Sequence, residues 1–105
     1  MSTESSAGRI EQAKPVSVLD RQYRENITLA MGRPKKRTPS AEKLDDIVRA
    51  FMAAKLGIKF SKNSWWDIGQ HPEYPSALAK LPEILRGYIA QQVVYAQQLE
   101  QQRAQ

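Results

Sequence analysis

The sequence predicts an all-α protein, a small bundle of three to four helices with a flexible N-terminal arm and a long C-terminal helix. Apolar residues recur at helical spacing in three regions, and no segment shows the strict alternation of a strand. A content of 41% hydrophobic and 26% charged residues is typical of a globular protein, and 105 residues suffice for one modest core. We therefore expect a single helical domain over residues 16–105.

Residues 1–15 are rich in Ser, Glu, Gly and Lys, so they are expected to form a flexible arm. The first helix is predicted to begin at Ser17, whose hydroxyl can cap the helix while Asp20 completes a capping box. Gly32 and Pro34 end it after about four turns. Its apolar stripe consists of Val16, Leu19, Tyr23, Ile27 and Ala30.

A second helix is predicted to open at Thr38 or Ser40, with Pro39 close to its first position. The acidic residues Glu42, Asp45 and Asp46 lie near the positive end of its dipole, and Gly57 ends it. The clearest amphipathic stripe of the chain is formed by Leu44, Ile47, Val48, Phe51, Met52 and Leu56.

Periodicity fails between residues 58 and 75, where a short helix or an irregular loop should turn its aromatic side chains inward. A third helical region follows Pro75 and is interrupted or bent at Pro82. In this region seven residues follow one another at alternating spacings of three and four positions, which is the heptad pattern of a helical seam. They are Leu78, Leu81, Leu85, Tyr88, Gln92, Tyr95 and Leu99.

This seam has two interpretations. It can pack on the first two helices, with the Gln-rich C-terminal end fraying in water, or the helix can continue past the globule and meet another subunit. In the second case the protein interface would consist of Leu85, Tyr88, Gln92, Tyr95 and Leu99.

The sequence contains little that points to catalysis. It has one His and no Cys, and acid–base or nucleophilic catalysis needs two or three converging polar groups. His71, beside Pro72, is expected to form a turn or a hydrogen bond, and its neighbours Asp67 and Glu73 are too common a combination to indicate a metal site. We expect a non-catalytic protein without cofactor or metal. With no apolar run of roughly 20 residues and no signal peptide, a cytosolic protein that does not contact membranes is expected.

The positive charge is concentrated in one region. The formal net charge is +5, but Arg33 to Lys62 contain nine Lys/Arg and three Asp/Glu, a local balance of +6. Within this window we define the basic segment as Arg33, Lys35, Lys36 and Arg37, which lie in a Pro-containing link between two predicted helices. Such concentrated charge is typical of a phosphate-binding surface. The segment could instead be a solvated basic turn.

Further nucleic-acid contacts are expected nearby. The candidates are Arg49, Lys55, Lys59 and Lys62, which would neutralise phosphates, and Trp65, which could stack on a base. Trp65 and Trp66 are adjacent and cannot both enter one core pocket, so the alternative is that one fills the core and the other covers a helix end.

Three resemblances extend this prediction. GRPKKR resembles the core of an AT-hook, although Met31 stands where such hooks carry Arg. FMAAKLGIKFSKNSWW is similar to a helix-turn-helix with Ala53 at the small position, although Asn63 occupies a position that is usually aliphatic. Together with HPEY, the stretch from Gly32 to Tyr74 resembles phage small-terminase DNA-binding domains. This resemblance implies a recognition helix around Ser61 to Trp66 and C-terminal helices that assemble a ring.

In size, helicity and charge the chain is also similar to the small subunits of CRISPR effector complexes, which hold a phosphate backbone without recognising bases. The sequence thus predicts a nucleic-acid-binding subunit of a larger nucleoprotein assembly. The alternative is a protein-interaction adaptor or inhibitor that docks through its C-terminal helix. DNA and RNA are not distinguished at this stage.

Overall fold

The structure, a computed structural model, describes residues 20–33, 37–61 and 63–104, and these residues form five helices and no strand. The predicted all-α class and the long C-terminal helix are therefore confirmed, with one more helix than the upper number expected. The predicted arm, residues 1–15, lies outside the described residues.

Helix α2, Arg21–Ala30, begins later than predicted. Asp20 is extended and is itself the N-cap, and its side chain accepts a 2.9 Å hydrogen bond from the Tyr23 amide. The predicted start at Ser17 is wrong because Asp20 lies outside the helix and takes the capping role that was assigned to Ser17. Gly32, with a φ of 79°, turns the chain at the other end as predicted.

Helix α3, Ala41–Leu56, follows the prediction closely. Ser40 is the N-cap and accepts a hydrogen bond from the Lys43 amide, and Gly57 ends the helix with a φ of 72°. The Ile58 amide reaches the Ala53 carbonyl oxygen at 2.9 Å, which completes the turn after the helix. The buried face of α3 consists of Leu44, Val48, Met52, Ala53 and Leu56.

Two short helices occupy the region without periodicity, α4, Ser64–Gln70, and α5, Tyr74–Ala79. The chain then breaks at Pro82, as expected, and continues as α6, Glu83–Ala104. The expected inward turn of the aromatic residues is confirmed for Trp65, which is buried, but is wrong for Phe60, which is 46% exposed. Phe60 instead packs against the Arg49 guanidinium, whose central carbon lies 4.8 Å from the ring centroid.

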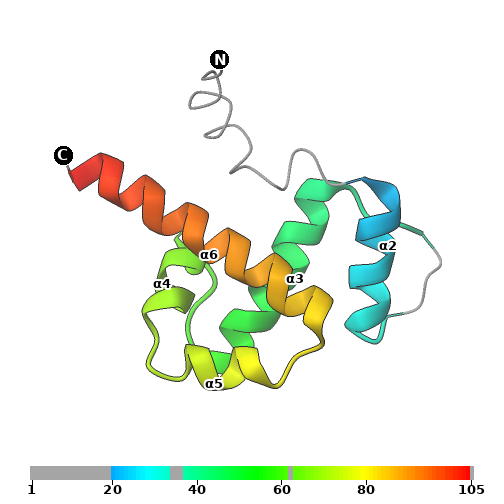
Figure 1. Cartoon of the computed structure of the whole chain (residues 1–105), viewed down its shortest axis with the longest axis horizontal. Helices are drawn as coiled ribbons and strands as arrows, with labels where there is room; N and C mark the ends of the chain where they lie inside the picture. The colour runs from blue at the N-terminus through cyan, green and yellow to red at the C-terminus, as the bar shows by residue number, and fades with distance from the viewer. Residues whose placement is uncertain (1–19, 34–36, 62, 105) are drawn as a thin grey trace, which may run out of the picture.

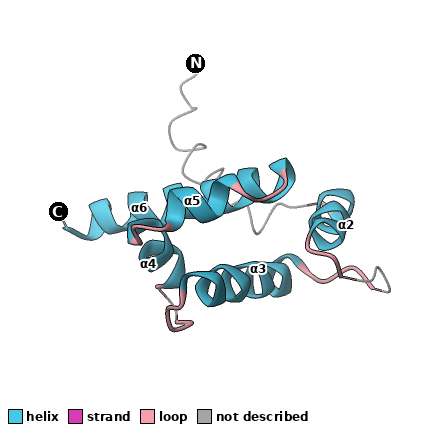
Figure 2. Cartoon of the chain, turned by 90° about the horizontal axis from the view of Figure 1, so that it is seen from below, coloured by secondary structure: helices cyan, strands magenta, loops and turns pink. Residues whose placement is uncertain are grey.

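The helices pack around α6, which contacts α2, α4 and α5 (Figure 1). Figure 2 shows α3 in one layer and α5 with α6 in another, while α2 and α4 lie toward opposite ends. The core side chains are Ile27, Leu44, Val48, Met52, Leu56, Trp65, Ile68, Leu81, Leu85, Tyr88, Ile89 and Val93. One expectation was that the Gln-rich C-terminal end frays in water. In the structure α6 instead continues to Ala104, and its last turns extend beyond this core (Figure 1).

A polar cluster inside the core joins three helices. The Asp45 carboxylate of α3 accepts hydrogen bonds from Trp65 Nε1 at 2.9 Å and from the Tyr88 hydroxyl at 3.1 Å. The two rings also meet edge to face, with their centroids 6.4 Å apart. Because Trp65 belongs to α4 and Tyr88 to α6, this cluster fixes the positions of both helices relative to α3.

Candidate nucleic-acid interface

The basic segment lies in the link between α2 and α3, and hydrogen bonds to α2 are made at Arg33 and, beyond the segment, at Pro39. After Gly32 reverses the chain, the Arg33 amide donates to the Thr28 carbonyl oxygen at 3.2 Å. At the other end, Arg24 Nη1 donates to the Pro39 carbonyl oxygen at 2.6 Å. The chain is thus tied to α2 at Arg33 and at Pro39, two residues after Arg37, while Lys35 and Lys36 lie outside the described residues.

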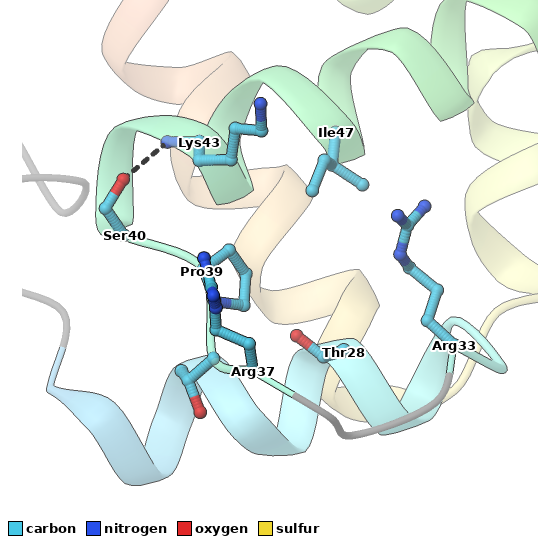
Figure 3. Close-up of a pocket in the computed structure, with 8 residues that line it drawn as sticks. Thr28, Arg33, Arg37, Pro39, Ser40, Lys43 and Ile47 are labelled. Atoms are coloured by element: carbon cyan, nitrogen blue, oxygen red, sulfur yellow. Dashed lines mark hydrogen bonds between the residues drawn. The ribbon is translucent and has the colours of Figure 1, made fainter.

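A recess of about 480 Å³ opens between α2 and α3 beside the basic segment (Figure 3). We call it the α2–α3 recess. Its walls carry three cations, three hydroxyl groups and two apolar side chains. They are Arg33, Arg37 and Lys43; Thr28, Thr38 and Ser40; and Pro39 and Ile47.

The charges of the recess are not neutralised by the fold. Arg33, Arg37 and Lys43 are exposed, and their side chains form no ion pair or hydrogen bond with any residue that the structure describes. No Asp or Glu occurs among the described residues that line the recess. The nearby Glu25 binds Arg21 at 3.1 Å and the Thr38 hydroxyl at 3.1 Å. The described side chains that line the recess therefore carry three positive charges and no negative charge.

Arg49 differs from these cations and does not fit its predicted role. Its side chain is only 15% exposed and pairs with Asp46 at 2.7 Å and Asp45 at 3.5 Å. It also donates to the Ser61 carbonyl oxygen at 3.2 Å. Arg49 thus connects α3 to the segment that leads into α4, and two carboxylates already pair with the guanidinium that was predicted to neutralise phosphate.

Trp65 does not fit its predicted role either. It is 8% exposed and its indole N–H is bound to Asp45, so a base cannot stack on it in this fold. The alternative, in which one of the adjacent Trp residues fills the core, describes Trp65 correctly. Trp66 is half-buried and lines a second recess of about 330 Å³ together with Tyr95 and Leu99.

The remaining predicted cations lie away from the recess. Lys55 and Lys59 are exposed, and Lys55 Nζ lies 5.5 Å from the centroid of the Phe51 ring. Lys55 is twelve residues after Lys43 on the same helix, which is a distance of about 18 Å along the axis. Only a ligand as long as a strand could contact both ends of α3. Lys62 lies outside the described residues.

The predicted recognition helix around Ser61 to Trp66 is also placed differently. α4 begins at Ser64, because the buried Ser64 hydroxyl accepts from the Ser61 amide at 2.6 Å and donates to the Ser61 carbonyl oxygen at 2.8 Å. The helix directs Ser64, Trp65 and Ile68 into the core and exposes Asp67 and Gln70. An exposed face that carries an acid and no base is poorly suited to the major groove.

The predicted protein interface is divided by the fold. Leu85, Tyr88 and Gln92 are at most 3% exposed, so they belong to the core of the monomer and are not available for docking. Tyr95 is half-buried, and Leu99 is 40% exposed on the part of α6 that extends beyond the core.

Sequence reasoning missed Lys43, which the structure adds to the basic surface. A Lys in the first turn of a helix opposes the macrodipole and costs roughly 0.3–1 kcal/mol. Residues that violate a local preference in this way tend to mark functional positions. Once Ser40 is recognised as the N-cap, the position of Lys43 three residues later could have indicated a cation in the first turn of α3, close in sequence to the basic segment.

His71 has the hydrogen-bonding role that was expected, since its Nδ1 accepts from the Glu73 amide at 3.0 Å. In the part of the chain that the structure describes, no three His, Asp or Glu side chains gather in a way that could hold a metal ion. No helix there combines the length and the apolar character that a bilayer span requires. Comparisons with protein-family models, curated proteins and solved structures gave no significant match.

Proposed function

We propose that this chain is a non-catalytic nucleic-acid-binding subunit of a larger nucleoprotein complex. The basic segment, Arg33, Lys35, Lys36 and Arg37, would hold the phosphate backbone, as in the small subunits of CRISPR effector complexes or in phage small terminases. The observation that carries the proposal is the α2–α3 recess, which Arg33, Arg37 and Lys43 line without a carboxylate partner among the described residues. A polyanion supplies the charge that such a surface lacks.

The arrangement favours contact with the backbone over recognition of bases. The cations lie on a link and at two helix ends, and α4 presents no basic face for a groove. Phosphate contacts fix the position of a protein on a duplex but carry no sequence information. We therefore expect binding that depends strongly on salt and weakly on sequence.

The experiment is a gel-shift series at low salt with duplex DNA, single-stranded DNA and RNA. The quadruple variant Arg33→Ala, Lys35→Ala, Lys36→Ala and Arg37→Ala should lose binding to whichever nucleic acid the parent binds. The double variant Arg33→Ala with Arg37→Ala should weaken binding, whereas its matched control, Lys80→Ala with Arg103→Ala, removes the same two charges from exposed sites outside the recess and should not. Equal binding by the quadruple variant and the parent would refute the proposal.

A second candidate function is a protein-interaction adaptor or inhibitor. It is favoured by the last turns of α6, where Leu99 is 40% exposed and lines the second recess with Tyr95 and Trp66. This candidate predicts that the parent binds no nucleic acid at physiological salt, so the gel-shift series repeated at physiological salt separates the two functions.

A further inference from the structure

The α2–α3 recess is larger than a contact to a single phosphate oxygen requires. Its volume of about 480 Å³ lies in the range of roughly 300–1,000 Å³ that is usual for small-molecule sites. Thr28 of α2 and Lys43 and Ile47 in the first two turns of α3 contribute to its walls, and the other lining residues belong to the link between the two helices. In Figure 3 the Arg33 side chain extends from the end of α2 toward α3, on the side of Ile47.

The chemistry of the walls changes across the recess. Arg33, Arg37 and Lys43 supply positive charge, whereas Pro39 and Ile47 supply an apolar surface. Inorganic phosphate could satisfy only the first part. A ligand that satisfies both parts has an anionic group attached to a less polar body, and the phosphate and sugar of one nucleotide are such a pair.

The hydrogen bonds that the hydroxyl groups of the recess can still form are compatible with this ligand. Ser40 Oγ accepts from the Lys43 amide at 3.2 Å, so its own proton can be donated to a phosphate oxygen. Thr28 Oγ1 already donates to the Arg24 carbonyl oxygen at 2.8 Å, so toward a ligand it can only accept. The 2′-hydroxyl of an RNA strand or a sugar hydroxyl of a free nucleotide can donate to it, but a phosphate diester and a deoxyribose within a DNA strand cannot. The Lys43 amide is already capped by Ser40, so the site depends on the three cations rather than on the helix end.

We infer that the α2–α3 recess binds one nucleotide unit of the bound strand, with its phosphate among Arg33, Arg37 and Lys43 and its sugar against Ile47. This inference rests on the proposed function and makes it more specific, because it gives Lys43 a direct phosphate contact that the basic segment alone does not include. The same chemistry would accept a free nucleotide, so the test must separate the two sources.

The first measurement compares Lys43→Gln with Lys80→Gln, an exposed lysine outside the recess that matches the charge change. Binding of a labelled oligonucleotide is followed by fluorescence anisotropy between about 50 and 200 mM salt. On a duplex, loss of one phosphate contact should reduce the slope of log affinity against log salt concentration by about 0.9. The ratio of the parent's affinity to that of Lys43→Gln should therefore fall by about 3.5-fold between the lowest and the highest salt concentration. Lys80→Gln should retain the slope of the parent.

The second measurement follows the backbone amide signals of Thr28, Ser40 and Ile47 by NMR. We expect the oligonucleotide and a nucleoside monophosphate to shift all three signals, and inorganic phosphate to shift Ser40 without Ile47. If the oligonucleotide binds but leaves these signals unchanged, and Lys43→Gln behaves as Lys80→Gln does, the inference fails while the proposed function stands. Shifts with the monophosphate and no binding of any oligonucleotide would overturn both.

Discussion

The contact between α4 and α6 leads to a prediction with opposite outcomes for the same substitution at two glycines. A Cβ atom added to Gly69 in α4 would lie 2.5 Å from Val93 Cγ1 of α6, whereas one added to Gly87 in α6 would meet nothing within 4 Å. Val93 is 3% exposed, and a β-branched side chain in a helix has one strongly preferred rotamer. It therefore cannot turn aside, and the two helices would have to separate.

The magnitude follows from comparing the variants. Replacing Gly by Ala inside a helix gains up to about 1 kcal/mol in helix propensity, and Gly87→Ala should show this gain. Gly69→Ala has a smaller gain, near the end of a short helix, and adds an overpacking cost of typically 1–3 kcal/mol. We thus expect Gly69→Ala to have a free energy of unfolding about 1–3 kcal/mol below that of Gly87→Ala.

The assay is urea denaturation followed by far-UV circular dichroism and by tryptophan fluorescence, with parent, Gly69→Ala and Gly87→Ala compared at one protein concentration. If the two variants unfold at the same urea concentration, the close approach of α4 to α6 is refuted. The packing of α4 against the core would then also be refuted.

Two further predictions concern the polar cluster in the core. Asp45→Ala leaves the Trp65 indole N–H and the buried Tyr88 hydroxyl without their acceptor. The free energy of unfolding should fall by about 1–3 kcal/mol for each buried donor, and urea denaturation of the variant measures this loss. Stability equal to that of the parent would contradict the prediction. Burial and the Asp45 carboxylate raise the pKa of Tyr88, so the folded state holds its proton where the unfolded chain releases it. Stability should be retained below pH ~10 and fall as the pH rises further, and an undiminished urea midpoint in that alkaline range would refute this assignment.

The parts of the fold that sequence reasoning predicted are those that local signals determine. α3 combines a long apolar stripe with Ser40 and Gly57 at its ends, and all three signals agree. α4 and α5 are too short to show a period, so their existence depends on contacts with α3 and α6 that no local window contains. The start of α2 was wrong because Ser17 and Asp20 are both good caps and only the folded chain shows which one is used.

The candidate site was predicted in part for a similar reason. Arg33 and Arg37 were found because a run of cations without acids is visible in the sequence. Arg49 was misassigned although its spacing of four residues from Asp45 predicts an ion pair on one helix face. Which of the two adjacent Trp residues fills the core could not be predicted, because the choice involves distant contacts such as the hydrogen bond from Trp65 Nε1 to Asp45, twenty residues earlier.

The most direct test of the central claim is the salt dependence of binding to duplex DNA for the parent and the quadruple variant. If the four cations of the basic segment each neutralise one phosphate, the log–log slope of the variant should be shallower than that of the parent by about 3.6. Equal slopes would show that the basic segment contacts no phosphate, and the account of this protein as a backbone-binding subunit would be contradicted.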